Sequence, residues 1–338
     1  MLESGTLTHK KFLYNYLRNL GKEKPEIHKL KIMPKTYILS QTSDCIKFLE
    51  EPQLTHQYIL KKFENPKGSS IHLIQNLPAY RRSLSIALKK YSNLPDRPHE
   101  RAEFRKIFGA VVQEYLQNPL LLEGYKCNLR VFLIIQSTDP FLCYLHRGYY
   151  TRASMLYEEG QKEQRMAYLS NLRAQKLHKD FNKIENELVW SQSRFEEYIT
   201  EKYADGKDGR SPGELLDGLW DRVRTCLRAL VENWQKGVSM RRGTFEVLNC
   251  DFVISDDFQE VYLVDINSRA SIRQTTPVGR RVAREVILQS IDNSLTLLKE
   301  LKGIEEVVRH SELQSDERYE KVLGKMKTEG FELLWKNF

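Results

Sequence analysis

Two strand-like segments decide the fold of this chain: Phe245-Glu-Val-Leu-Asn-Cys-Asp-Phe-Val-Ile-Ser255 and Val261-Tyr-Leu-Val-Asp-Ile-Asn267. A short acidic turn joins them, so the pattern predicts an antiparallel hairpin. Side chains alternate between the two faces of a strand, and Asp265 and Asn267 therefore point to the same face. If the hairpin is tight, Asp251 lies opposite Asp265 and shares that face.

These three side chains, Asp251, Asp265 and Asn267, form a candidate metal site. Carboxylate and amide oxygens are hard ligands that suit Mg²⁺, which fills its other positions with water and nucleotide phosphates. Acidic residues near strand ends are also common as turn formers. Both aspartates, however, sit inside otherwise apolar strands. A buried carboxylate is costly unless it is paired or bound to a cation, which favours the metal site.

A second polar row leads into the strongly β-like stretch 127–136. Lys126, Asn128 and Arg130 are two residues apart, so in a strand they share one face while apolar residues occupy the other. Such a row can hold a polyphosphate and a carboxylate. Arg152, in the segment 150–154, adds a second planar cation that can grip a carboxylate through two hydrogen bonds.

A lysine-rich hairpin is the third candidate element. The segments 57–63 and 71–75 read as strands joined by a basic loop, with Lys61 in the first strand and Lys67 and Gly68 at the tip. The backbone N–H groups and lysines of such a tip can wrap the phosphates of a nucleotide. Lysine–glycine turns are also common on surfaces that bind nothing, so this hairpin does not decide between the two interpretations.

Helical patterns lie between and after these strands. Ser211-Pro-Gly-Glu214 is typical of a capping box, and apolar residues then recur at helical spacing up to Trp234. A long amphipathic helix is predicted over Val278–Leu301. Strands early and late with helices between them favour an α+β fold over a regularly alternating parallel sheet.

Composition restricts the class of protein. The 338 residues are 41% hydrophobic and 29% charged, which excludes global disorder. No stretch is apolar enough to span a membrane, and the first residues lack a secretory pattern. The five cysteines are widely spaced, which favours a reducing compartment over a disulfide framework. The net charge of +8 fits either a solvated surface or an acidic partner, and no nucleic-acid-binding motif is present.

Four blocks, in order along the chain, resemble the motifs of the tubulin tyrosine ligase-like family: Tyr58–Lys61, Val112–Arg130, Leu169–Asn171 and Phe245–Ser268. The resemblance implies an ATP-grasp fold with the nucleotide between the central and C-terminal lobes. The domains expected from it are a short N-terminal lobe (1–56), a central lobe (57–113), a C-terminal lobe (114–302) and a charged tail (303–338).

The resemblance also implies a role for each candidate residue. The cofactors are ATP and Mg²⁺. The two arginines Arg130 and Arg152 would hold carboxylates and stabilise an acyl-phosphate, and Asp251, Asp265 and Asn267 would bind the metal. The nucleotide would be held by Lys61, Lys67, Gly68, Gln113, Glu114, Tyr115, Leu116, Lys126, Asn128 and Asn171.

The implied activity is ligation of an amino acid, glycine or glutamate, to carboxylates of the acidic tails of tubulin. The spacing around Leu169–Asn171 is most similar to the polyglycylating branch. We expect a monomer that works with tubulin or microtubules and a free amino acid in the cytoplasm, at the cytoskeleton or cilium, without nucleic acid or membrane.

Departures from the family motifs leave two alternatives open. Asn128 replaces an aspartate, Asp265 a glutamate, Tyr168 a histidine, Ser70 a glycine and Lys62 a proline. One alternative is a weak or inactive pseudoenzyme that binds microtubules or nucleotide. The other is a ligase for an acidic protein other than tubulin.

Overall fold

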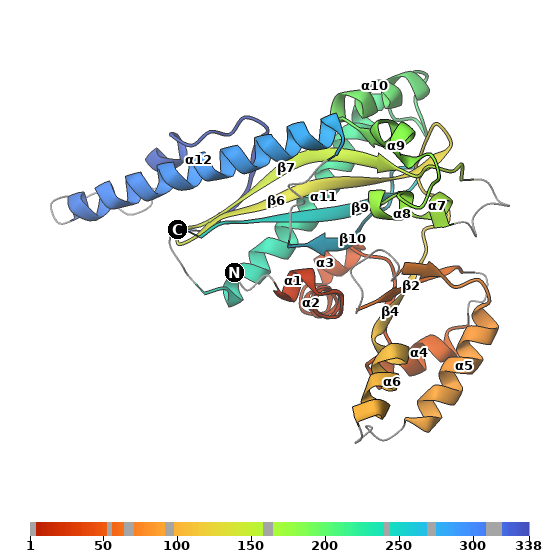
Figure 1. The fold of residues 1–338 in the computed structure, drawn as a ribbon. Helices are drawn as coiled ribbons and strands as arrows, with labels where there is room; N and C mark the ends of the chain where they lie inside the picture. Colours follow the sequence, from red (N-terminus) through yellow and green to blue (C-terminus); the bar gives the residue numbers. More distant parts are fainter. Residues whose placement is uncertain are drawn as a thin grey trace.

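The structure is a computed structural model that describes residues 5–52, 56–63, 71–91, 98–157, 165–239, 244–268, 275–308 and 320–337. It contains two antiparallel sheets and the helices that cover them (Figure 1). The predicted α+β class is confirmed. None of the helices in the described ranges is long and apolar enough to cross a membrane.

The smaller sheet has four strands in the order β1-β4-β2-β3. These strands are β1 (Thr36–Ile38), β2 (Tyr58–Lys62), β3 (Ile71–Leu73) and β4 (Ala110–Glu114). Its helices are α4 (Thr42–Glu50), α5 (Leu77–Lys90) and α6 (Pro98–Phe108). Phe48, Leu84 and Phe108, one from each helix, are buried together with Tyr58 and Val112 of the sheet. This apolar cluster fixes β2 and β4, the strands that carry Lys61 and Gln113.

The larger sheet has the main strand order β10-β9-β6-β7-β11, and two short strands pair with β6 and β7. Its strands are β5 (Leu121–Leu122), β6 (Tyr125–Thr138), β7 (Phe141–Arg152), β8 (Val189–Trp190), β9 (Glu246–Ile254), β10 (Val261–Asn267) and β11 (Phe331–Asn337). The predicted hairpin of β9 and β10 is confirmed, and Asp251 pairs with Asp265.

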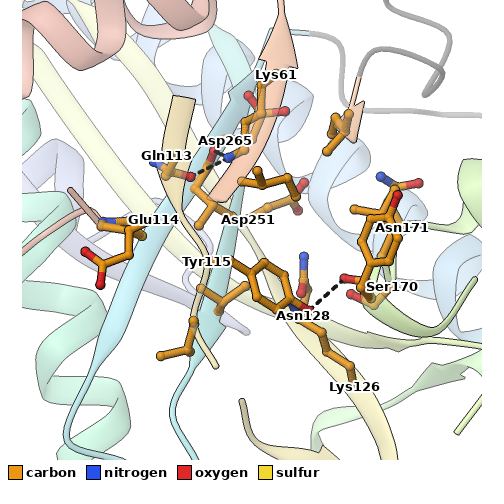
Figure 2. A pocket seen from close by; sticks show the side chains of 18 residues that line it. Lys61, Gln113, Glu114, Tyr115, Lys126, Asn128, Ser170, Asn171, Asp251 and Asp265 are labelled. Carbon is orange, nitrogen blue, oxygen red and sulfur yellow. Dashed lines mark hydrogen bonds between the residues drawn. The ribbon is translucent and has the colours of Figure 1, made fainter. Parts of the chain in front are cut away.

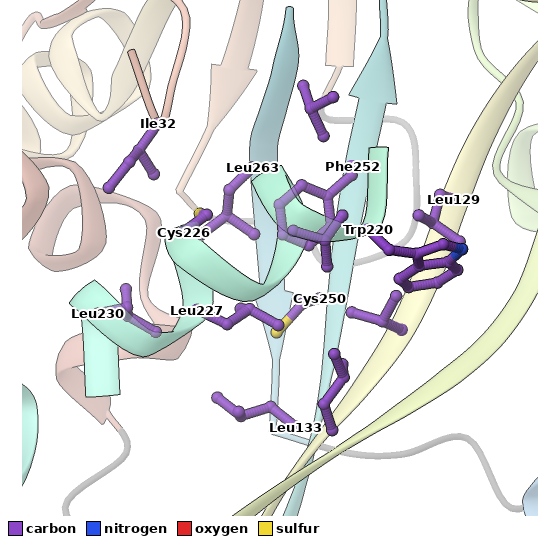
Figure 3. Packing of buried hydrophobic residues seen from close by; sticks show 14 of the residues in the cluster. Ile32, Leu129, Leu133, Trp220, Cys226, Leu227, Leu230, Cys250, Phe252 and Leu263 are labelled. Atoms are coloured by element: carbon purple, nitrogen blue, oxygen red, sulfur yellow. The ribbon is translucent and has the colours of Figure 1, made fainter. Parts of the chain in front are cut away.

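Two long helices cover the two faces of this sheet. Helix α11 (Pro212–Trp234) begins with the predicted capping box and buries its apolar stripe against one face. Figure 3 shows Trp220 and Leu227 of α11 beside Leu129, Cys250 and Phe252 of the strands. Helix α12 (Pro277–Val308) packs against the opposite face through Val282 and Val286. All five cysteines are buried and free.

Shorter helices complete the described part of the chain. They are α1 (Gly5–Thr8), α2 (Lys10–Glu23), α3 (Pro25–Lys29), α7 (Arg165–Tyr168), α8 (Leu172–Gln175), α9 (Phe181–Ile184) and α10 (Gln192–Lys202), with the 3-10 turns η2 (Glu185–Leu188) and η3 (Gln235–Gly237). Figure 1 shows α2 beside the smaller sheet and β10.

The predicted domain division stays a prediction. The smaller sheet takes β1 from the segment expected as an N-terminal lobe, and β1 pairs with β4. The larger sheet takes β11 from the segment expected as a charged tail, and β11 pairs with β7 along Phe331–Asn337. Charge dominates the composition of that tail, but Phe331 and Leu334 are buried against the rest of the fold.

Candidate functional site

A pocket lies between the two sheets and brings together ten of the predicted site residues (Figure 2). The empty space within it is about 700 Å³, a volume that includes open solvent. The predicted residues that line it are Lys61, Gln113, Glu114, Tyr115, Leu116, Lys126, Asn128, Asn171, Asp251 and Asp265. The other lining residues are Pro34, Ile59, Ile71, Tyr168, Leu169, Ser170, Val253 and Val264.

Two buried lysines face this pocket from different sheets. Lys61 of β2 is 6% exposed, and its Nζ donates to the Gln113 Oε1 (2.6 Å) and the Val264 carbonyl (3.0 Å). Lys126 of β6 is 5% exposed and donates to the Tyr115 hydroxyl (2.8 Å). Neither lysine forms an ion pair with a carboxylate of the described residues.

Burial lowers the pKa of both lysines to about 7, because an ammonium group loses hydration inside the protein. For Lys61, the carboxylates of Asp265 and Asp251 partly oppose this effect. An anion in the pocket would favour the charged form of both side chains. The two lysines are therefore cationic groups that can bind a polyanion in this pocket.

Two aspartates face each other at one end of the pocket. Strand β9 lies between β6 and β10, and its Asp251 pairs in register with Arg130 on one side and Asp265 on the other. Arg130 grips Asp251 through two hydrogen bonds, from Nε (2.7 Å) and Nη2 (2.8 Å). Lys10 of α2 lies 3.0 Å from Asp265. Each carboxylate thus has a cationic partner from the chain itself.

A glycine on the neighbouring strand supports the position of Arg130. Gly148 of β7 has φ +64°, and a Cβ there would lie 2.0 Å from the Arg130 carbonyl oxygen. Only glycine adopts this conformation and allows this approach without strain. The β6–β7 register shifts between Arg130 and Phe132, so the strand pairing is irregular beside this close approach.

The two aspartates have the donor chemistry that Mg²⁺ requires. Their side chains are 14% and 21% exposed for Asp251 and Asp265, so a metal can reach them. Asn267 is adjacent, since its amide nitrogen lies 3.5 Å from the Asp265 Oδ2, although Asn267 does not line the pocket. No group of three or more His, Cys, Asp or Glu side chains gathers among the described residues, at this pocket or elsewhere, so the candidate site rests on two carboxylates and an amide. A metal held here would take one or two carboxylates and complete its shell with phosphate and water oxygens.

Part of the pocket wall is apolar. Ile59 and Ile71 of the smaller sheet and Val253 and Val264 of the larger one line the pocket, together with Leu116. Apolar walls with a few polar groups are typical of sites for organic ligands.

Two polar side chains of β4 that line the pocket are held by neighbouring residues. The Gln113 amide donates to the Thr36 hydroxyl (2.8 Å) while its oxygen accepts from Lys61. Glu114 pairs with His56 at 2.7 Å, where β4 ends.

Two buried polar atoms in the pocket wall are available to a ligand. The Asn128 Oδ1 and the Ser170 Oγ are buried and have no hydrogen-bond partner in the described part of the chain. Buried polar atoms are almost always paired with protein, water or ligand. Asn171 follows Ser170 in the pocket wall, and its own side chain caps α8 by accepting from the Ala174 N–H (2.8 Å).

The structure places Arg152 away from the pocket. Arg152 pairs in register with Cys127, which belongs to the core under α11, so its side chain is on the opposite face from Lys126 and Asn128. Its guanidinium contacts Glu123 (2.6 Å) and Glu187 (3.6 Å). Lys126, Asn128 and Arg130 therefore share one face of the sheet, and Arg152 lies on the other face. The predicted loop residues Lys67, Gly68 and Ser70 lie outside the described residues.

Sequence reasoning missed the contribution of α2. Lys10 and Tyr14 are one helical turn apart, and both reach the site: Lys10 contacts Asp265, and the Tyr14 hydroxyl accepts from Lys61 (3.2 Å). Tyr14 is fully buried. A lysine and a tyrosine one helical turn apart carry no functional signal by themselves, and no local pattern connects residue 10 to residue 265. Ser170 lies inside the motif block Leu169–Asn171, but a serine hydroxyl carries no charge that would mark it as a site residue.

Sequence comparison places these features among known proteins. Protein polyglycylase TTLL10 of Macaca fascicularis is 27% identical over 272 residues, which cover 80% of this chain and 43% of the relative. Inactive polyglycylase TTLL10 of Homo sapiens is 26% identical over 272 residues, 80% of this chain and 39% of the relative. Protein monoglycylase TTLL8 of Mus musculus is 25% identical over 181 residues, 52% and 21% respectively. The chain spans less than half the length of these relatives.

The family itself is shown by a longer match. The model of the tubulin-tyrosine ligase family matches residues 1–302, which contain both sheets apart from β11 and all the residues that line the pocket. This confirms the resemblance inferred from the four motif blocks. The chain belongs to the tubulin-tyrosine ligase family.

Proposed function

We propose that this chain is an ATP- and Mg²⁺-dependent ligase that adds an amino acid to carboxylates of acidic tubulin tails. Ligases of its family are ATP-dependent amino acid ligases. One observation carries the proposal: two buried lysines, Lys61 and Lys126, which have no carboxylate partner in the described part of the chain, face a pocket that also contains Asp251 and Asp265. This combination suits a polyphosphate together with a divalent cation.

In the proposed complex the nucleotide lies between the two sheets. The base fits the apolar part of the wall near Leu116, with Gln113 and Glu114 at its edge, and Asn128 accepts from a ribose hydroxyl. The phosphates lie between Lys61 and Lys126, which become fully charged as the phosphates replace lost hydration. Asp251 and Asp265, with Asn267 beside them, would hold Mg²⁺, which supplies neutralisation of the phosphate charge.

Two displacement steps then form the amide bond. The acceptor carboxylate attacks the γ-phosphorus, ADP leaves, and an acyl-phosphate results. The free amine of the incoming amino acid attacks the acyl carbon, phosphate leaves, and the nitrogen loses a proton. Lys61 and Lys126 contribute by positioning and by stabilising charge. Arg130 keeps Asp251 in place through its two hydrogen bonds.

Glycine is the amino acid that we propose, because the relatives described above are named as glycylases. The net charge of +8 would steer an acidic tail toward the enzyme. The proposed setting is the cytoplasm, at the cytoskeleton or the cilium, with tubulin as partner and the chain as a monomer.

A second candidate is a nucleotide-binding protein without ligase activity. Asn128 and Tyr168 line the pocket at positions where the family motifs have an aspartate and a histidine. One relative, the human one, is named an inactive polyglycylase. This alternative keeps Mg²⁺-dependent ATP binding and loses turnover.

Mass spectrometry of tubulin tails tests the proposal directly. The chain is incubated with tubulin, ATP, Mg²⁺ and an equimolar mixture of isotopically labelled amino acids, with Asp265→Ala as the control. We expect labelled glycine on glutamate side chains only with the unchanged chain. ATP binding without any labelled tail would favour the second candidate, and absence of Mg²⁺-dependent ATP binding would exclude both.

A further inference from the structure

Lys10 contacts a carboxylate of the site from a helix outside the two sheets. It opens α2 and reaches Asp265 of β10, with its Nζ 3.0 Å from Oδ1 and 3.2 Å from Oδ2. The two side chains are 20% and 21% exposed. The ammonium therefore covers both oxygens of Asp265, the atoms that a metal would need.

Helix α2 is anchored to a helix of each sheet. The Tyr16 hydroxyl donates to the Leu230 carbonyl of α11 (3.0 Å), and Arg18 pairs with Asp44 of α4 at 2.7 Å. The backbone at Lys10 is thus held in place, and only its flexible side chain can leave Asp265.

Local helix energetics do not explain why a lysine stands at this position. The first turn of a helix carries a partial positive charge that disfavours cations. His9, Lys10 and Lys11 nevertheless follow one another at the start of α2. The contact with Asp265 offsets the unfavourable interaction of the Lys10 charge with the start of the helix.

The two ion pairs of the site differ in how easily they open. Arg130 is bound to Asp251 in a planar two-bond geometry and comes from the adjacent strand of the same sheet. Lys10 is a point charge on a flexible four-carbon stem from a separate helix. A divalent cation that enters between the aspartates brings excess positive charge, and Lys10 is the cation that can move away.

We propose that Lys10 is the resident counter-ion of Asp265 and that the metal binds by displacing its ammonium group. Lys10 thereby weakens metal binding to the free protein and makes strong binding dependent on nucleotide phosphates, which provide the displaced ammonium with a new partner. This inference rests on the proposed function, because it takes Asp265 as a metal ligand.

Direct measurement of metal binding tests this inference without any turnover. Mn²⁺ serves as the probe, and free Mn²⁺ is quantified by electron paramagnetic resonance with the full chain, first alone and then with a non-hydrolysable ATP analogue. The variants are Lys10→Met and the control Lys11→Met. The control removes the same charge from the next residue, whose side chain forms no ion pair with Asp265. Thermal melting checks that each variant folds, and Lys10→Gln replaces Lys10→Met if the latter does not.

Without nucleotide, we expect Lys10→Met to bind Mn²⁺ about tenfold more tightly than the unchanged chain, since a charged hydrogen-bonded pair no longer competes. Lys11→Met should stay within about twofold of the unchanged chain, because a partly exposed charge that is not paired with Asp265 is screened. Equal or weaker Mn²⁺ binding by Lys10→Met overturns this inference alone. No Mn²⁺ binding by any variant, with or without the analogue, overturns the proposed metal site and this inference together.

Discussion

One face of β6 borders the pocket, and the other face is buried in the hydrophobic core. Lys126 and Asn128 line the pocket, and Arg130 beside them grips Asp251. Cys127 and Leu129, between them in sequence, are buried in the core under α11. Alternate positions along a strand point to opposite faces of the sheet. Whether a side chain reaches the pocket or the core is therefore set by its position along the strand rather than by its residue type. Arg152 illustrates this, because a residue suited to carboxylate binding lies on the scaffold face.

The largest expected effect tests the pocket face. Asp265→Ala should lower ATP turnover at least about 100-fold, because a ligand that holds the charge-neutralising metal is lost. Steady-state release of ADP is the measurement. Asp256→Ala, an exposed aspartate in the turn between β9 and β10, is the matched control and should leave turnover unchanged. Turnover that survives Asp265→Ala would show that the metal ligands are assigned incorrectly.

The scaffold face should respond in stability instead. Leu129 is fully buried. Leu129→Ala should lower the free energy of unfolding by about 2–5 kcal/mol, the usual result of a cavity in a packed core. Denaturant titration measures this change. Leu288→Ala on the exposed side of α12 should change stability by no more than about 0.5 kcal/mol. Similar losses for both leucines would contradict the described core.

Arg152→Ala sharpens the comparison most directly. We expect a loss of about 1–2 kcal/mol in stability, from the removed contacts with Glu123 and Glu187 and with the Tyr125 ring, which lies 4.4 Å from the guanidinium. The KM values for ATP, amino acid and acceptor should not change. A selective rise in the KM for the acceptor or the amino acid would instead restore the carboxylate-binding role that the family resemblance implies.

The smallest expected effect is a pH dependence of nucleotide binding. The pKa of Lys61 and of Lys126 is lowered from 10.5 to about 7 by burial. At pH 8 both are mostly neutral in the free protein, so binding of a polyphosphate should take up about one to two protons. Calorimetry in buffers of different ionisation enthalpy measures this number. Lys126→Met should reduce it by about one, and an unchanged number would mean that Lys126 does not meet the phosphates.

The same shift has a definite sign for stability. The folded pKa of each lysine is depressed, so the unfolded chain binds more protons between pH about 7 and 10.5. The free energy of unfolding of the unliganded protein should therefore rise with pH across this window and fall as pH drops toward 7. Denaturant titrations at pH 7 and pH 9 compare the two conditions, and Lys61→Met should flatten the difference.

Local patterns predicted much of the molecule because their physical causes are local. The capping box at Ser211 and the apolar stripe after it need only one helical turn and its neighbours to be recognised. The β9–β10 hairpin and the pairing of Asp251 with Asp265 follow from alternation across a short turn. Ten predicted residues line one pocket. They lie in the motif blocks, and the fold brings these blocks together. Their roles in binding remain predictions.

Other features arise from contacts between distant segments. Strand β11 joins the sheet by pairing with β7, although its neighbourhood in sequence is charged and resembles a tail. The face of Arg152 depends on its register with Cys127 of another strand.

The sequence by itself determined the α+β class, the family and the polar rows of β6, β9 and β10, since these depend on residue type and short-range periodicity. Only the tertiary structure decided which charges meet. Lys10 finds Asp265 across 255 positions, and Arg130 finds Asp251 across 121 positions. Such pairs form because packing of α2 and of the sheet brings desolvated charges within reach, and no local pattern encodes that distance.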